Sequence, residues 1–222
     1  MSMADRPFRP PRPEAVVIPG PAGPLEALAE DPGEPSTACV VVCHPHPLYH
    51  GTMNNKVVHA LARAAHRLGL PSVRFNFRGV GASAGAWDEG RGETGDALAA
   101  AEWARARWPD RRLWLAGFSF GSFVSLRAAG PAGAAALVTV APPVRRFPVE
   151  ETPRPGCPWL VVHGEDDELV SAAAVRDWVA GLADGPEVVV VPGATHFFHG
   201  RLNELQARVG EFWGPLAGTG DR

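Results

Sequence analysis

Short apolar strands that alternate with helices are the feature that most restricts what this chain can fold into. Seven runs rich in β-branched residues are expected to be strands: Glu14–Ile18, Cys39–Cys43, Ser72–Phe77, Leu113–Ala116, Ala136–Val140, Trp159–His163 and Glu187–Val191. Helical patterns lie between most of them, at about Val57–Leu68, Thr94–Trp108, Phe120–Ala129, Ala172–Leu182 and Leu202–Leu216. Continuously apolar strands separated by helices predict an α/β fold with a mostly parallel sheet covered on both faces.

The start of the chain departs from this alternation. Two strand-like pieces, Ala15–Ile18 and Leu25–Ala29, follow one another without a helix between them, which predicts an antiparallel hairpin at one edge of the sheet. No linker or internal repeat follows. Residues 1–222 are therefore expected to form a single domain with about eight strands and with loose tails at 1–13 and 217–222.

Composition and charge exclude several classes of protein. Hydrophobic residues make up 45% of the 222 residues and charged residues 20%, which provides for a sizeable core and excludes disorder. The net charge of -3 and the single lysine, Lys56, leave no basic stripe, so neither a nucleic-acid partner nor an anionic membrane is expected. The apolar runs are far shorter than the ~20 residues of a membrane span, and Met1–Glu14 lacks a secretory pattern, which predicts a cytoplasmic location. Three cysteines without a CxxC pair predict no disulfide framework and no cysteine-type zinc site.

The sharpest chemical signal is the run Gly117–Gly121, which reads GFSFG and lies between the strand Leu113–Ala116 and a helical segment. In that context, G-x-S-x-G is typical of a sharp strand-to-helix turn that exposes the hydroxyl of its serine. The bare pattern also occurs as a glycine-rich turn with a capping serine. The strand before it and the helix after it favour Ser119 as a nucleophile.

Two later loops carry the partners that a serine nucleophile requires. The acidic run Glu165–Glu168 lies at the end of one expected strand, and His196 and His199 lie at the end of the next. The carboxyl ends of parallel strands meet at the edge where open α/β sheets bind ligands. His196 is preferred to His199 because it lies nearer the strand and follows small residues, whereas spacing alone leaves Asp166 and Asp167 both open.

The loop that begins His44-Pro-His46-Pro supports two interpretations. Acyl transfer needs backbone amides that bind the oxyanion, one from the residue after the nucleophile, Phe120, and one from this loop. Proline has no N–H, so within His44–Pro47 only the amides of His44 and His46 could donate, with Leu48 next. The amide of His46 is preferred as the better placed of these. Alternatively, His44, His46 and the nearby His50 resemble metal-ligand spacing, so a zinc hydrolase is a rival hypothesis.

The glycine-rich run Phe77–Gly85 is interpreted as a tight turn and not as a phosphate loop, because Trp87–Gly95 does not resemble the start of a helix. We therefore expect no organic cofactor. The preferred mechanism also requires no metal.

Taken together, these motifs resemble the α/β-hydrolase superfamily, most closely its small bacterial members without a lid. The resemblance covers nearly the whole chain and rests on five segments: HPHPL…TMNNKVV at 44–58, RFNFRGVGAS at 74–83, the GFSFG run, H-G-x-x-D at 163–167 and G-A-x-H-F-F at 193–198. It implies that Asp167 orients the catalytic histidine and that His196 is the base. Relatives often carry glycine where this chain has His50.

The resulting prediction is a serine hydrolase that cleaves small carboxylic esters through an acyl-enzyme intermediate. Thioesters, lactones and amides are alternative substrates for the same triad, and a metallohydrolase or a non-catalytic binding protein is less favoured. Leu48, Phe118 and Phe197 lie beside the proposed catalytic atoms in the sequence and are expected to contact an apolar substrate.

A cap over the active site is usually inserted after the sixth strand in this superfamily. Here only Ala141–Pro158 intervenes, 18 residues that include six prolines. Such a segment is poorly suited to a helical lid. The chain is therefore expected to have an open site and not to act as a lid-dependent lipase on long-chain fats.

Overall fold

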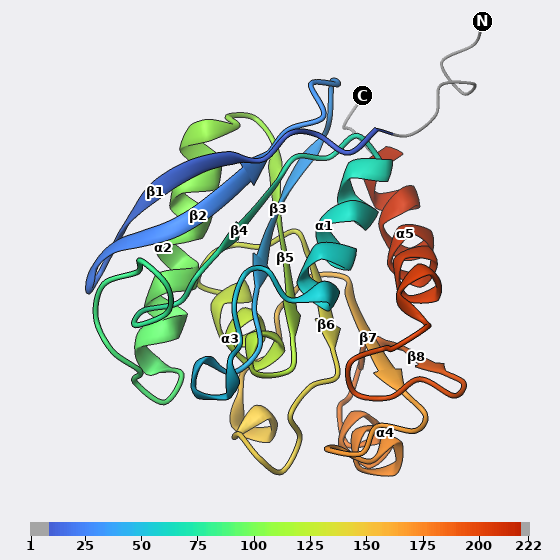
Figure 1. Ribbon diagram of the computed structural model, residues 1–222. Helices are drawn as coiled ribbons and strands as arrows, with labels where there is room; N and C mark the ends of the chain where they lie inside the picture. The colour runs from blue at the N-terminus through green and yellow to red at the C-terminus, as the bar shows by residue number, and fades with distance from the viewer. Residues whose placement is uncertain (1–8, 219–222) are drawn as a thin grey trace, which may run out of the picture.

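The computed structural model describes residues 9–218 and has an eight-stranded sheet at its centre (Figure 1). The strands are β1 (Glu14–Gly20), β2 (Gly23–Glu30), β3 (Ala38–Cys43), β4 (Ser72–Phe75), β5 (Arg112–Phe118), β6 (Ala136–Val140), β7 (Trp159–Gly164) and β8 (Glu187–Val191). Their order is β1-β2-β4-β3-β5-β6-β7-β8. Strand β2 pairs antiparallel with both β1 and β4, and every other pairing in this order is parallel. The predicted fold class, including the hairpin at the sheet edge, is confirmed.

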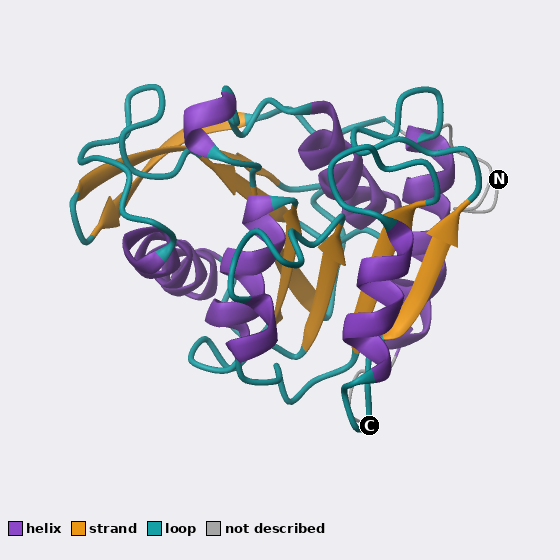
Figure 2. Ribbon diagram, turned by 90° about the horizontal axis from the view of Figure 1, so that it is seen from below, coloured by secondary structure: helices purple, strands orange, loops and turns teal. Residues whose placement is uncertain are grey.

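Helices cover both faces of this sheet (Figure 2). They are α1 (Lys56–Arg67), α2 (Arg91–Arg107), α3 (Phe120–Ala129), α4 (Ala172–Ala180) and α5 (Leu202–Gly218). Helices α1 and α5 pack on one face, and α2, α3 and α4 contribute to the core on the other. The short 3-10 turns η2 (Pro47–Tyr49) and η3 (Val149–Glu151) lie in loops.

The continuous apolar runs are explained by these two cores. In β3, Cys39, Val41 and Cys43 belong to the core under α2 and α3. Val40 and Val42, which alternate with them, belong to the core under α1 and α5. Because neighbouring side chains of a strand point to opposite faces, a central strand between two helical layers must be apolar at every position.

The largest difference from the sequence prediction is the start of α2. This helix begins at Arg91, inside a segment that was not expected to start a helix. Glu93 accounts for the difference, because its carboxylate accepts hydrogen bonds from the amides of Gly90 at 2.7 Å and Asp88 at 2.9 Å. A glutamate in the first turn thereby satisfies backbone donors before the helix.

Other element boundaries differ by about two residues. Strand β4 ends at Phe75, because the amide of Asn76 donates to the carbonyl of Glu26 and that of Phe77 donates to the ring of His44. Of the expected tails, residues 217–218 belong to α5, and 9–13 have no regular structure. The remainder, 1–8 and 219–222, lies outside the described residues.

The connection between β6 and β7 is short and η3 is its one regular element, so among residues 9–218 no cap covers the carboxyl edge of the sheet. Across residues 9–218, no helix combines the length and apolar character needed to cross a lipid bilayer.

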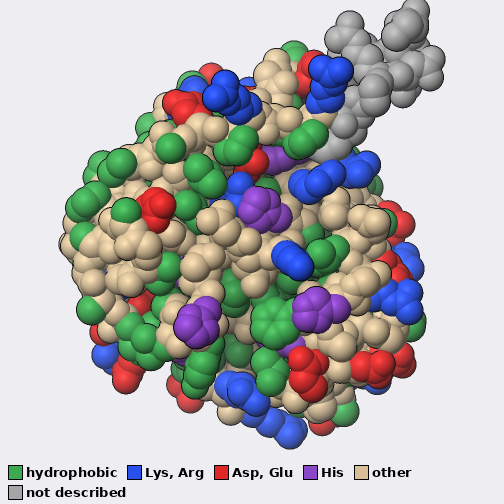
Figure 3. Space-filling model, viewed as in Figure 1, with side chains coloured by type: hydrophobic (Ala, Val, Ile, Leu, Met, Phe, Trp, Pro, Cys, Tyr) green, Lys and Arg blue, Asp and Glu red, His purple; other side chains and the backbone are tan. Residues whose placement is uncertain are grey.

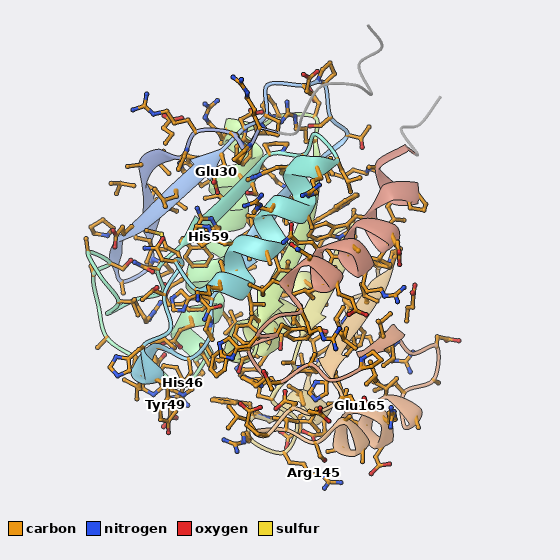
Figure 4. All side chains as sticks on the ribbon, turned by 45° about the vertical axis from the view of Figure 1, so that its right-hand side comes forward. Glu30, His46, Tyr49, His59, Arg145 and Glu165 are labelled. Carbon is orange, nitrogen blue, oxygen red and sulfur yellow. The ribbon has the colours of Figure 1, made fainter. Side chains whose placement is uncertain are left out.

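A buried ion pair joins the N-terminal hairpin to the rest of the sheet. Arg74 on β4 donates through Nε to Glu30 on β2 at 2.9 Å, and only 1% and 9% of the two side chains are exposed. Arg74 also donates to the carbonyl of Met53 at 2.9 Å and lies 2.9 Å from Nε2 of His59. Figure 4 shows Glu30 and His59 in the same region of the molecule.

Removing one partner of this pair leaves a buried charge without compensation. Arg74→Ala is therefore expected to lower the free energy of unfolding by about 3–5 kcal/mol, measured by urea denaturation. Arg91→Ala is the matched control, because its pair with Asp88 is 67% and 42% exposed, and it should cost less than about 1 kcal/mol. Equal effects of the two variants would contradict this account.

Candidate active site

A sharp turn between β5 and α3 carries Ser119. Its φ of 53° and ψ of -120° lie where residues other than glycine are rarely found. The amide of Ser119 donates to the carbonyl of Val140 at 2.8 Å, and its own carbonyl accepts from the hydroxyl of Ser122 at 2.6 Å. These bonds hold the strained backbone in place, as is common for residues with a special conformation at a functional site.

Glycine is required on both sides of this serine. A Cβ on Gly117 would overlap the carbonyl of Gly121. A Cβ on Gly121 would overlap the carbonyls of Cys43 and His44 at the end of β3. The two glycines of the GFSFG run therefore let β5, α3 and the loop after β3 approach one another closely.

Three loops at the carboxyl edge of the sheet bring Asp167, His196 and Ser119 into line. Asp167 Oδ2 lies 2.7 Å from His196 Nδ1, and His196 Nε2 lies 3.1 Å from Ser119 Oγ. Because a carboxylate only accepts, Nδ1 of His196 carries the proton, which leaves Nε2 facing the serine hydroxyl as an acceptor. The structure does not bring Asp166 or His199 into this arrangement: both side chains are exposed, and the ring of His199 stacks on Phe197.

The carboxylate of Asp167 is held in its ionised form. Burial favours the neutral acid, but the hydrogen bond from His196 and the amides of Val170 and Leu169, each at 2.8 Å, outweigh it. Together they hold the pKa of Asp167 below its usual value. His163 supports the same loop by donating through Nε2 to the carbonyl of Val170 at 2.8 Å, and burial lowers the pKa of His163, which keeps its ring neutral.

Two further carboxylates of the acidic run hold the loop that bears His196. Glu168 accepts from the amide of His196 at 3.1 Å, and Glu165 accepts from the amide of Gly193 at 3.2 Å. Sequence reasoning missed these contacts. The only available signal was the position of both residues beside Asp167, which does not reveal a partner 28 residues later in the chain.

The amides of Phe120 and His46 are free to bind a ligand. Neither donates to an acceptor among residues 9–218, and both residues line the cleft described below. The His46 ring is fixed on two sides: its Nδ1 accepts from the amide of Leu48 at 3.2 Å, and it stacks on Trp87 with a centroid distance of 4.4 Å. Partial burial lowers the pKa of His46, which favours the neutral ring that this acceptor role requires. His46 lies on the loop between β3 and α1, beside Tyr49 (Figure 4).

Two of the three histidines of the rival metal hypothesis, His44 and His46, form hydrogen bonds through their rings within the protein. His44 Nδ1 donates to the carbonyl of Pro45 at 2.6 Å, and Nε2 accepts from the amide of Phe77 at 3.0 Å. Burial lowers the pKa of His44 to about 4, so the ring is neutral. With both ring nitrogens occupied, His44 has none left for a metal. In the described part of the chain, no three His, Cys, Asp or Glu side chains are grouped so that they can hold an ion.

A cleft of about 720 Å³ opens above Ser119, and much of its wall is apolar. It is lined by Pro45, His46, Tyr49, His50, Gly51, Asn55, Ser119, Phe120, Pro143, Arg146, Phe147, Leu169, Val170, His196 and Phe197. In Figure 3, which shows the molecule from the side of Figure 1, histidine side chains flank hydrophobic ones in the lower half of the face.

Of the three residues expected to contact substrate, only Phe197 lines this cleft. Phe118 is fully buried, because it points to the face of β5 under α1 and α5, and it packs against the ring of His196 at 5.1 Å. Leu48 is 64% exposed and lies outside the lining. The predictions for Phe118 and Leu48 are therefore corrected by the structure, which places neither side chain in the lining of the cleft.

Comparisons with known proteins identify the fold family. A model of the alpha/beta hydrolase fold family matches residues 40–154. The crystal structure of a serine hydrolase without a lid from Xanthomonas campestris is 42% identical, with a TM-score of 0.89, and the match covers 97% of this chain and all of that one. A serine hydrolase homologue from Coxiella burnetii is 44% identical, with a TM-score of 0.86 and coverage of 89% and 96%. An uncharacterized protein of Rickettsia prowazekii is 32% identical over 204 residues, which cover 87% of this chain and 85% of the relative.

The close approach at Gly121 can be tested by adding one methyl group. Gly121→Ala forces Cβ into two carbonyls and is expected to lower the free energy of unfolding by about 1–3 kcal/mol, measured by urea denaturation. Gly130→Ala is the matched control, since its φ is -63° and no atom lies within 4 Å of the added Cβ. It should leave stability unchanged or raise it by about 0.4–1 kcal/mol. A Gly121→Ala protein as stable as wild type would refute the packing argument.

Proposed function

The chain belongs to the α/β-hydrolase fold family, and we propose that it is a serine hydrolase that cleaves small carboxylic esters through an acyl-enzyme intermediate. The observation that carries the proposal is the line of hydrogen-bonding atoms from Asp167 through His196 to Ser119, which ends in an open cleft. Such a relay converts a weakly nucleophilic hydroxyl into a reactive one. We further propose that residues 1–222 form a single catalytic domain, since both cores share one sheet.

In the first half of the reaction, Ser119 Oγ attacks the carbonyl carbon of the ester while His196 Nε2 takes the hydroxyl proton. Asp167 holds the imidazole in the tautomer that places the proton on Nδ1 and stabilises the imidazolium that forms. The amides of Phe120 and His46 donate to the oxyanion of the tetrahedral intermediate. The intermediate collapses when His196 returns its proton to the departing alcohol.

The second half of the reaction releases the acid. Water takes the place of the alcohol and attacks the acyl carbon while His196 Nε2 takes its proton. The second tetrahedral intermediate then collapses by breaking the bond between the acyl carbon and Ser119 Oγ, which releases the acid. The oxyanion is bound by the same two amides. The final transfer of the proton to Ser119 regenerates the enzyme, and no metal or organic cofactor takes part in any step.

Thioesters, lactones and amides are alternative substrates, because the same triad attacks each of these carbonyls. The apolar wall formed by Phe120, Phe147, Leu169 and Phe197 favours an acyl group of low polarity without selecting among these bonds. A non-catalytic binding protein is disfavoured, since the strained backbone of Ser119 would then have no use that offsets its cost.

Substitutions of Ser119 and Asp167, compared with substitutions of nearby residues outside the relay, test the proposed catalytic roles. Ser119→Ala should abolish nearly all ester hydrolysis, and Asp167→Asn should lower kcat by about 10⁴-fold, because the wrong tautomer of His196 becomes favoured. Asp166→Asn and His199→Ala are the matched controls and should stay within about twofold of wild type, since neither side chain is in the relay. Steady-state hydrolysis of 4-nitrophenyl butyrate measures all four. Wild-type activity in Ser119→Ala would overturn the proposal.

Chelation separates the proposal from the metallohydrolase hypothesis. Overnight dialysis against EDTA and 1,10-phenanthroline is expected to leave esterase activity unchanged, because the ring nitrogens of His44 are already bonded within the protein. The measurement is the rate before and after dialysis, with zinc added back to one sample. A loss of activity that zinc restores would favour the metal mechanism.

A further inference from the structure

The cleft above Ser119 carries a positive charge that the proposed reaction does not use. Among the side chains that line it, Arg146 is the only Lys, Arg, Asp or Glu. Arg146 comes from the segment between β6 and β7, and no carboxylate within residues 9–218 pairs with its guanidinium. Its neighbour Arg145, in contrast, lies 3.8 Å from Asp177 and does not line the cleft. Figure 4 shows Arg145 at the bottom edge of the molecule.

A smaller pocket of about 320 Å³ continues the cleft, and it too is lined by a positively charged side chain. The two cavities share His50, Asn55 and Phe197. The smaller pocket adds Lys56, the single lysine of the chain, and His199, and no carboxylate lines it. The chain as a whole has a net charge of -3, so this concentration of cations at the cleft does not follow from the composition.

An unpaired guanidinium beside apolar walls is a binding group for an anion. Phe120, Phe147 and Phe197 line the same cleft, and Arg146 is exposed, so its guanidinium is accessible to an incoming anion. The planar guanidinium also matches the two oxygens of a carboxylate or a phosphate. Acyl transfer by Ser119 requires neither Arg146 nor Lys56.

We propose that the substrates of this cleft are esters that carry an anionic group, a carboxylate or a phosphate, and that Arg146 binds that group while Lys56 adds to the attraction. This inference rests on the proposed function, because it names the class of ester on which Ser119 acts. Arg146 thereby determines specificity without taking part in bond cleavage.

A matched pair of substrates tests the inference. 4-(Butanoyloxy)benzoate and its methyl ester differ in one charge, and 4-(butanoyloxy)phenyl phosphate provides the phosphate. For each variant, kcat/KM on the anionic ester is divided by kcat/KM on the neutral ester. This ratio is then compared with that of the wild type. The comparison cancels the difference in leaving-group reactivity between the esters, because that difference is the same for every variant. Arg146→Gln should lower this ratio by about tenfold for at least one of the anions. Arg146→Glu should lower it further, and Arg145→Gln should not change it.

The outcomes distinguish this inference from the proposed function. Hydrolysis of the neutral ester shows that each variant is folded and that the Ser119 chemistry operates. If wild type cleaves the neutral ester and Arg146→Gln and Arg146→Glu leave both anionic ratios unchanged, the inference is wrong and the proposed function stands. If wild type cleaves none of the three esters, the proposed function itself fails. A ratio that falls towards the Arg146→Gln value as NaCl is raised to 1 M would support the electrostatic origin.

Discussion

The close approach of β5, α3 and the loop after β3 is the constraint on which the rest of the site depends. No side chain fits at Gly117 or Gly121, and this leaves room for the first turn of α3 to lie against the carbonyl of His44. The turn thereby holds Ser119 at a positive φ, at a cost of about 1–3 kcal/mol. Burial of Phe118 and Phe120 on either side offsets that cost, since each buried phenylalanine contributes about 1.5–3 kcal/mol.

The sequence predicted the parts of the molecule that follow from local pattern. The central strands were identifiable because a strand between two helical layers is apolar throughout, and Ser119 because G-x-S-x-G stood between a strand and a helix. The hydrogen bonds of Glu165 and Glu168 to the loop of His196 were not predictable, since spacing along the acidic run does not show which carboxylate meets a loop 28 residues away. The pairing of Asp167 with His196 was expected from the family resemblance alone. The start of α2 was missed because its cap is a glutamate that reaches back to Gly90.

The error at Phe118 has a simple geometrical origin. Residues on either side of Ser119 are adjacent in sequence but belong to different cores, Phe118 under α1 and α5 and Phe120 under α2 and α3. Proximity to the nucleophile in the sequence therefore does not imply contact with a substrate. Residues of the cleft that were not predicted, such as Phe147 and Arg146, lie on the short segment that replaces a cap, where sequence periodicity gives no information.

The central claim is that Ser119 is the nucleophile, and labelling with a fluorophosphonate followed by mass spectrometry of the peptides tests it most directly. The reagent reacts with a serine that a neighbouring base activates, so the relay predicts one modified residue, Ser119. Labelling should disappear in Ser119→Ala and slow greatly in His196→Ala. Modification of a different residue, or a wild-type protein that hydrolyses esters without being labelled, would contradict the account.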